Sequence, residues 1–181
     1  MEGASFSLIV KDVHNGETVF AYDTLRQLTP ASVMKTVTTA TALEILGEDY
    51  RFPTTLAYDG SIEKGLLKGN LYIKGSGDPS LGSAHFAPYH KRFLQEWISA
   101  LKKVGIHKIQ GAVIADESIF DTEGTSLKWV GEDMGSYYGA GSYGLCVFDN
   151  LYKLGLQTGA PGTRPKLKGT EPELSGIHFH N

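Results

Sequence analysis

A serine and a lysine stand three positions apart where a helix is expected to begin. Ser32 and Lys35 follow Pro30, and proline suits the first turn of a helix because its missing N–H would have no acceptor there. Residues at this spacing share a helix face, so the hydroxyl and the amine can meet. A serine hydroxyl becomes a useful nucleophile when a base lies within hydrogen-bond reach. The pair therefore has the chemistry of acyl transfer.

The same spacing has a second interpretation, in which the serine caps the helix and the lysine is solvated one turn later. The bare Ser-x-x-Lys pattern occurs readily by chance. A lysine can take the serine proton only where its ammonium group is desolvated or lies beside other cations. The apolar neighbours Val33, Met34 and Val37 indicate a partly buried site, and the positive end of the helix dipole at Ser32 would favour a developing oxyanion. The surrounding elements must decide between the two.

Those elements begin with a hairpin and a helix. Residues 5–11 and 18–22 have the character of strands, and Asn15-Gly16 is a strong turn signal between them. The segment 30–46 is apolar on most sides, which predicts a buried helix, and Gly47 is its expected C-cap.

Beyond this helix the pattern is mixed. Strands are expected at 54–58, 69–74 and 109–115, a helix at 88–104, a strand pair within 145–156, and irregular structure at 158–173. The chain is therefore predicted to be α+β, with one domain over residues 1–55 and a second over 56–181.

Three separated segments resemble one known family. Pro30-Ala31-Ser32-x-x-Lys35, before a helix rich in threonine and alanine, looks like the active-site region of penicillin-binding proteins and serine β-lactamases. The runs Gly69–Leu81 (GNLYIKGSGDPSL) and Asp133–Ala140 (DMGSYYGA) are similar to the D-alanyl-D-alanine carboxypeptidase/endopeptidase family, peptidase family S13, also called class C low-molecular-mass penicillin-binding proteins. The resemblance extends from about Ser5 to Asn181.

The resemblance implies a fold and a reaction. Residues 1–55 would be the hairpin and active-site helix of a β-lactamase/transpeptidase-like domain, and residues 56–181 an inserted mixed α/β domain. Ser32 would attack the carbonyl between two D-alanines of a peptidoglycan stem peptide, with Lys35 taking its proton, and β-lactams would acylate the same serine. Asp133, matched by its context Asp133-Met134, would help to bind the distal side chain of the stem peptide.

Two further motifs of that family, Ser-x-Asn and Lys-Thr-Gly, do not occur in the 181 residues. The expectation is an N-terminal fragment that is inactive alone. Its first domain should expose apolar surface and favour a homodimer or segment exchange. The alternatives are another serine–lysine acyl hydrolase, a β-lactamase or an esterase, and a non-catalytic binding module.

Composition excludes other functions. The net charge is −3 without a basic run, so no nucleic-acid partner is expected. No apolar run approaches the length that crosses a bilayer. The chain opens without an export signal, so the expected location, periplasm or cell envelope, rests on the resemblance.

No cofactor and no metal are expected. The single cysteine, Cys146, lies in an apolar run and is predicted to be a small buried residue. His178 and His180 alternate on an expected strand, but two imidazoles lack the further ligands of a metal site. Gly75–Pro79 is interpreted as a turn, because it lacks the Gly-Lys-Ser/Thr step of a phosphate-binding loop. Two interpretations stay open for the aromatic side chains of Trp129 and Tyr137–Tyr138. They either line a groove or pack at an interface between domains.

Overall fold

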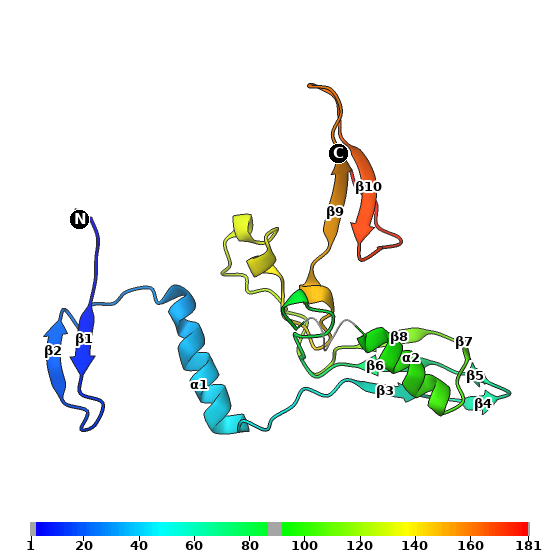
Figure 1. The fold of residues 1–181 in the computed structure, drawn as a ribbon, viewed down its shortest axis with the longest axis horizontal. Coiled ribbons are helices and arrows are strands. Elements are labelled where there is room, and N and C mark those ends of the chain that lie inside the picture. Colours follow the sequence, from blue (N-terminus) through cyan, green and yellow to red (C-terminus); the bar gives the residue numbers. More distant parts are fainter. Residues whose placement is uncertain (1–2, 87–91, 181) are drawn as a thin grey trace. The chain divides into compact units, whose positions relative to one another are not determined.

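The structure is a computed structural model that describes residues 3–86 and 92–180. It divides into two compact units, Met1–Tyr50 and Arg51–Asn181. The first unit contains the hairpin strands β1 (Leu8–Lys11) and β2 (Thr18–Tyr22), the short 3₁₀ helix η1 (Ala31–Val33) and the helix α1 (Met34–Leu46), as Figure 1 shows. The predicted boundary between residues 55 and 56 stays a prediction, since it assigns parts of the chain to domains of a larger enzyme.

The hairpin of the first unit is confirmed. β1 and β2 pair antiparallel, and Phe6 stacks on Tyr22 with ring centroids 4.8 Å apart. At the turn, the Glu17 N–H donates to Asn15 Oδ1 at 2.9 Å. An asparagine that accepts a hydrogen bond two residues on is typical of a tight turn, which is why the Asn-Gly signal predicted this element.

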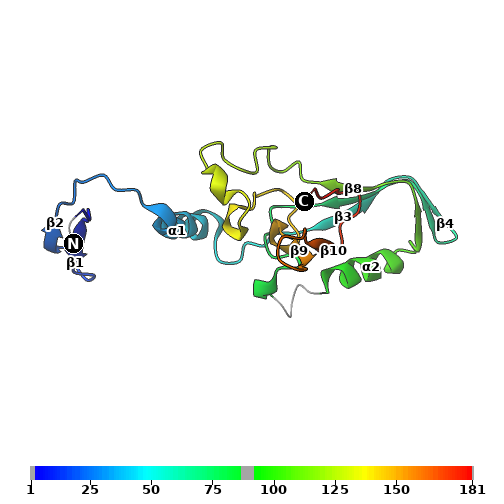
Figure 2. The same cartoon turned by 90° about the horizontal axis from the view of Figure 1, so that it is seen from above.

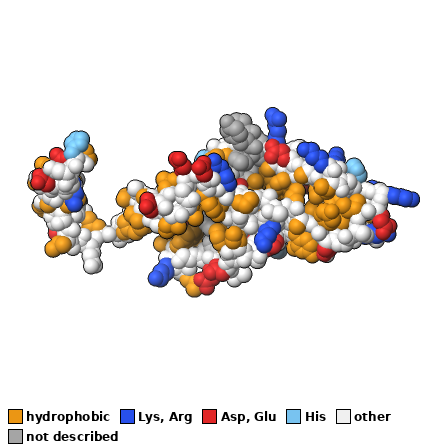
Figure 3. All heavy atoms as spheres, turned by 90° about the horizontal axis from the view of Figure 1, so that it is seen from below, with side chains coloured by type: hydrophobic (Ala, Val, Ile, Leu, Met, Phe, Trp, Pro, Cys, Tyr) orange, Lys and Arg blue, Asp and Glu red, His pale blue; other side chains and the backbone are white. Residues whose placement is uncertain are grey.

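The helix α1 ends as predicted but is not buried. Gly47 has φ 80°, and its N–H donates to Leu43 O at 3.0 Å. All residues of α1 are exposed, so the expectation of a helix buried on most sides is wrong for this unit. The reason is that, within the described residues of the first unit, the main packing partner of α1 is the short helix η1. The expected exposure of apolar surface in this part of the chain is confirmed, and apolar side chains are plain on the surface in Figure 3.

The second unit is built on two small sheets with the same topology. Their strands are β3 (Thr55–Tyr58), β4 (Ser61–Glu63), β5 (Leu66–Lys68), β6 (Leu71–Lys74), β7 (Lys108–Gln110) and β8 (Val113–Asp116). The orders are β3-β6-β8 and β4-β5-β7, and in each the first pair is antiparallel and the second parallel. Parallel neighbours need a crossover, which α2 (Phe93–Lys103) supplies; Figure 2 shows α2 running along one side of the strands.

The two sheets are successive parts of one three-stranded sheet that changes direction along a line of glycines. A Cβ added at Gly60 would collide with Lys68 O, one at Gly69 with Asp59 O, and one at Gly111 with Gly69 O. Three neighbouring chain segments therefore bend at the same level, and backbones approach each other there too closely for any side chain. The expected strand 109–115 is divided by this bend into β7 and β8.

The carboxylate of Asp59 stabilises the bend through hydrogen bonds to the neighbouring segment. Asp59 accepts hydrogen bonds from Asn70 N at 2.6 Å, Tyr72 Oη at 2.8 Å and Asn70 Nδ2 at 3.1 Å. Asn70 Oδ1 in turn accepts from Ala112 N at 2.9 Å. The backbone N–H of Asn70 and the hydroxyl of Tyr72 are the main causes that lower the pKa of Asp59, and the same Tyr72–Asp59 bond raises the pKa of Tyr72.

The core of the second unit lies where these strands meet α2 and the later loops. Its buried apolar residues are Leu67, Leu71, Leu81, Phe93, Ile106 and Cys146. The ring of Phe93 makes edge contacts with Trp97 and Phe148, at centroid distances of 4.9 Å and 5.7 Å. The burial of Cys146 is confirmed, since this residue is 8% exposed.

The last part of the chain differs from expectation. The predicted strand pair within 145–156 is wrong: Phe148, Asp149 and Asn150 have φ 54°, 58° and 52° and form the 3₁₀ helix η5 (Phe148–Asn150), because left-handed backbone cannot continue a strand. Strand β9 (Lys153–Gln157) begins after it and pairs antiparallel with β10 (Lys166–Glu171), within the segment expected to be irregular.

The expected second helix and the histidine pair complete the comparison. Residues 93–103 of the helix predicted at 88–104 are helical, and 88–91 lie outside the described residues. His178 and His180 lie in no strand. Across residues 3–86 and 92–180, no helix has both the length and the apolar character that crossing a bilayer requires.

Candidate active site

The structure brings Ser32 and Lys35 together. Lys35 Nζ donates a hydrogen bond to Ser32 Oγ across 3.1 Å. Ser32 lies in η1 and Lys35 in the first turn of α1, so the spacing of three residues spans the junction of two helix types. The hydroxyl and the amine are within the reach that proton transfer needs.

The chain enters this site through a tight turn. Val33 N donates to Pro30 O at 3.1 Å, and Met34 N donates to the carbonyl oxygens of Ala31 and Ser32. Pro30 has helical angles, φ −71° and ψ −19°, as expected of a proline at a helix start. No side chain caps the start of either η1 or α1, so the serine hydroxyl is not used as a cap and is free to face the lysine.

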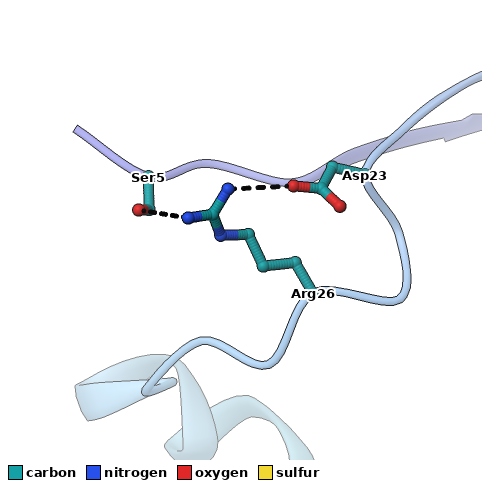
Figure 4. A network of polar contacts seen from close by, with 3 residues as sticks. All are labelled: Ser5, Asp23 and Arg26. Atoms are coloured by element: carbon teal, nitrogen blue, oxygen red, sulfur yellow. Dashed lines mark hydrogen bonds and ion pairs between the residues drawn. The ribbon is translucent and has the colours of Figure 1, made fainter. Parts of the chain in front are cut away.

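Arg26 ties the connecting segment to the hairpin. Its Nη1 donates to Asp23 Oδ2 at 3.1 Å and its Nη2 to Ser5 Oγ at 2.9 Å, as Figure 4 shows. Both charged side chains are about half exposed (48% and 40%), so the ion pair is a modest contribution to stability. Its geometric effect is to hold the segment before Pro30 against Ser5, which precedes β1, and Asp23, which follows β2.

The surroundings of the pair are open in this unit. Val33, Met34 and Val37 are 71%, 49% and 59% exposed, so the expected partial burial of the site is wrong for this part of the structure. The reason is again that, among the described elements of the first unit, α1 makes its main contacts with the short helix η1. The first unit therefore supplies the reach between nucleophile and amine, but not the desolvation that makes a lysine a base.

Asp133 lies in the second unit, at the end of the 3₁₀ helix η3 (Gly131–Asp133), and is half-buried. Tyr138 Oη donates to its Oδ1 at 3.2 Å. Its backbone oxygen accepts from Ser136 N at 3.0 Å and Ser136 Oγ at 2.6 Å. Gly139, in the 3₁₀ helix η4 (Tyr137–Gly139), passes so close that a Cβ would collide with Asp133 O. The carboxylate thus sits on a compact, internally bonded turn.

The loop that carries Asp133 leaves the strands after β8 and is closed at its base. Ser142 N donates to Gly124 O at 2.8 Å, and Gly77 N donates to Gly144 O at 2.7 Å. Asp78 and Leu145 form an isolated parallel bridge. The Gly75–Pro79 turn is therefore bonded to the segment at the end of the loop, which agrees with its interpretation as a turn.

Sequence reasoning missed the bond between Tyr138 and Asp133. Tyr138 was assigned to a groove or a seam, and no periodicity links residues five apart in irregular structure. Trp129 and Tyr137 lie in the same loop, and the Tyr137 ring contacts Tyr138 edge-on at 5.1 Å. No group of three or more metal-ligating side chains occurs among the residues that the structure describes. Ser32 and Lys35 belong to the first unit and Asp133 to the second.

Comparison with known proteins assigns the family. A family model described as "D-Ala-D-Ala carboxypeptidase 3 (S13) family" matches residues 1–180. The chain belongs to this family. Among curated relatives of this S13 chain, "D-alanyl-D-alanine carboxypeptidase DacB" of Haemophilus influenzae is 30% identical over 133 residues, 74% of this chain and 26% of the relative. A "D-alanyl-D-alanine carboxypeptidase" of an Actinomadura species is 33% identical over 140 residues, 77% of this chain and 24% of the relative.

Solved structures agree in fold. A crystal structure of penicillin binding protein 4 (dacB) from Haemophilus influenzae aligns with 88% of this S13 chain and 34% of its own, with TM-score 0.74 and 28% identity. A second structure of that protein, complexed with a β-lactam, aligns with 92% of this chain and 32% of its own, with TM-score 0.65 and 27% identity. The α+β class is confirmed. The chain spans about a quarter of the length of the curated relatives it matches.

Proposed function

We propose that this chain carries the nucleophile of a serine D,D-carboxypeptidase that acts on D-alanyl-D-alanine peptides of peptidoglycan. The observation that carries the proposal is the 3.1 Å contact between Lys35 Nζ and Ser32 Oγ. Membership of the S13 family supports it, since the matched relatives are named D-alanyl-D-alanine carboxypeptidases. Unit 1 would then belong to the catalytic domain and unit 2 to an inserted domain.

The proposed reaction has two steps. Lys35 Nζ takes the hydroxyl proton while Ser32 Oγ bonds to the carbonyl carbon of the penultimate D-alanine. The peptide C–N bond then breaks, and terminal D-alanine leaves with a proton on its amine. Water next attacks the ester carbonyl, which releases the shortened peptide and returns the proton to Ser32. The amide N–H of Ser32, which has no backbone acceptor in the described structure and lies at the positive end of the helices, would be half of the oxyanion hole.

The same acyl-enzyme accounts for two further parts of the proposal. A β-lactam carbonyl offers Ser32 an equivalent target, and one matched neighbour was solved with a β-lactam bound. Attack on a cross-linking peptide bond in place of the terminal one would give endopeptidase activity. Because peptidoglycan lies outside the cytoplasmic membrane, we place the protein in the periplasm or cell envelope.

Asp133 is proposed to bind the distal side chain of the stem peptide. Its carboxylate is held by Tyr138 on a turn that fixes its direction, and a carboxylate suits a stem-peptide residue that ends in an amine.

The deciding experiment is labelling by a fluorescent penicillin. The gene product that carries this sequence is incubated with the reagent beside its Ser32→Ala and Thr38→Ala variants. Thr38 is the matched control, because its hydroxyl on the same helix donates to Met34 O at 3.2 Å. We expect labelling of the wild type and of the Thr38 variant, and none of the Ser32 variant. Equal labelling of Ser32→Ala would contradict the assignment, and rapid release of the adduct would indicate a β-lactamase.

The 181 residues alone are proposed to be inactive. Neither Ser-x-Asn nor Lys-Thr-Gly occurs in them, and groups that act as a unit lose far more than tenfold when part of the unit is missing. The exposed apolar side chains of unit 1 would favour a homodimer of the isolated chain. Turnover of a D-alanyl-D-alanine peptide by the isolated chain would contradict the proposed inactivity. Sedimentation as a monomer at micromolar concentration would contradict the proposed homodimer.

A further inference from the structure

We infer that Ala31 is a positioning residue whose left-handed backbone presents Ser32 to the substrate. The inference rests on the proposed function of Ser32 and extends it to a neighbour that carries no reactive group. Ala31 has φ 45°, in a region that L-residues with a Cβ rarely adopt.

The position of this angle sets it apart from the others in the described part of the chain. Non-glycine residues with positive φ there are Asp23, Ala31, Lys64, Phe148, Asp149 and Asn150. Asp and Asn tolerate the left-handed region through their short polar side chains, and Lys64 lies in the two-residue turn between β4 and β5. Phe148 is fixed by core contacts of its ring with Phe93. Ala31 has neither a polar side chain nor burial, and it directly precedes the proposed nucleophile.

The hydrogen bonds around Ala31 show what the angle does. Its carbonyl already belongs to the helix, because it accepts from Met34 N. Its amide side belongs to the incoming chain, which turns at Pro30 and is closed by the bond from Val33 N to Pro30 O at 3.1 Å. Ala31 is therefore a left-handed residue between Pro30, whose angles are helical, and the helical backbone from Val33 onward.

The backbone of Ala31 bears directly on the amide of Ser32, because that N–H belongs to the peptide unit that follows Ala31. An N–H in the first turn of a helix has no acceptor within the helix. In the described structure this N–H has no backbone acceptor, and the hydroxyl of the same residue meets Lys35. A donor and a nucleophile on one residue, both uncovered, are the geometry that stabilises an oxyanion during attack by that hydroxyl.

The effect of the backbone angle on catalysis can be separated from its effect on stability by variants of Ala31 and of Ala40. Asparagine accepts the left-handed region and keeps a Cβ, glycine accepts it but frees the backbone, and valine is the residue type that it excludes most strongly. Ala40→Val, in the middle of α1 where angles are ordinary, is the matched control for the effect of valine on helix stability. The measurements are the melting temperature and the kinetics of acylation by penicillin, resolved into initial binding and the rate constant of the covalent step.

We expect Ala31→Val to lower the rate constant of acylation by about tenfold or more at saturating penicillin, with initial binding unchanged. Ala31→Asn should stay within about threefold of the wild type and Ala31→Gly should fall between, although its melting temperature equals or exceeds that of the wild type. Ala40→Val should leave the covalent step unchanged. A loss of rate that merely follows melting temperature would overturn the role of Ala31.

Failure of this inference is distinguishable from failure of the proposed function. If the wild type does not react with penicillin, the role of Ser32 is wrong and that of Ala31 falls with it. If the wild type reacts and Ala31→Val reacts equally fast, Ser32 keeps its role and the inference about Ala31 is refuted. Destabilisation by Ala31→Gly comparable to that by Ala40→Gly would also refute it, since that would mean ordinary helical angles at both positions.

Discussion

Tyr138 holds Asp133 through a hydrogen bond of 3.2 Å between its hydroxyl and Oδ1 of the carboxylate. The turn between the two residues is also closed by a hydrogen bond, because the hydroxyl of Ser136 donates to the backbone oxygen of Asp133. The side chain that is proposed to recognise a stem peptide is thus oriented by the turn on which it stands.

Removing the Tyr138 hydroxyl should weaken recognition of the peptide without affecting penicillin. In Tyr138→Phe the carboxylate loses one orienting bond of about 0.5–1.5 kcal/mol, which corresponds to a rise in KM of about two- to tenfold. The readout is the KM for D-alanyl-D-alanine peptides with and without a distal amine. Tyr137→Phe is the control, since its hydroxyl makes no bond in the described part of the chain. An equal effect on both peptides would contradict the role of Asp133.

Gly139 should tolerate no side chain, whereas Gly135 four residues earlier should. An alanine Cβ at Gly139 would collide with Asp133 O, but one at Gly135 meets nothing within 4 Å. We expect Gly139→Ala to lower the free energy of unfolding by about 1–3 kcal/mol through overpacking and to displace Asp133. Gly135→Ala should stay within about 0.5 kcal/mol. Urea denaturation compares the two; similar midpoints would contradict the close approach.

Acid should weaken the bend of the sheet through Asp59. Its pKa is lowered in the folded state, chiefly by the N–H of Asn70 and the hydroxyl of Tyr72, so its contribution is present above the unfolded pKa and is lost as pH falls through the folded one. Asp59→Asn should therefore be less stable at neutral pH and lose less stability toward acid. Urea midpoints across this pH range measure both slopes.

Cys146 should act as a hydrogen-bonding group as well as an apolar one. Its Sγ accepts from Asn150 Nδ2 at 3.2 Å and from Tyr143 N at 3.3 Å, and donates to Tyr143 O at 3.3 Å. Cys146→Ala deprives two donors of this acceptor at a cost of about 1–3 kcal/mol, while Cys146→Ser keeps a donor and an acceptor. We expect the serine variant to unfold at the higher urea concentration. A purely apolar site would give the reverse order, because burying a hydroxyl is unfavourable there.

The sequence predicted the elements whose signals are local. Asn15-Gly16 marked a hairpin and Gly47 a helix end, because the left-handed or tight backbone at these points selects residue types directly. The meeting of Ser32 and Lys35 was also predictable from a local signal, because residues three apart share a helix face. In the structure their Oγ and Nζ atoms are 3.1 Å apart.

What the sequence could not predict depends on contacts between distant residues. β4 and β5 are three residues each, with Leu67 the only fully buried side chain in them, so their alternation is too short to recognise. β10 is mainly polar and gains its structure from pairing with β9. The run Phe148–Asn150 adopts left-handed angles at a point where the ring of Phe148 contacts the distant residue Phe93. No local pattern encodes any of these pairings.

The bend at Gly60, Gly69 and Gly111 also limits how relatives of this chain can vary in length. The arm beyond the bend contains β4, β5 and β7, whose paired residues include Ile62, Leu67 and Ile109 in one row. Adding one residue to β5 alone would move Leu67 from the buried face to the open one. Insertions and deletions in this arm should therefore occur as pairs of residues, in all three strands together, while the line of the bend stays in place. Length variation among homologues would then be a record of this geometry.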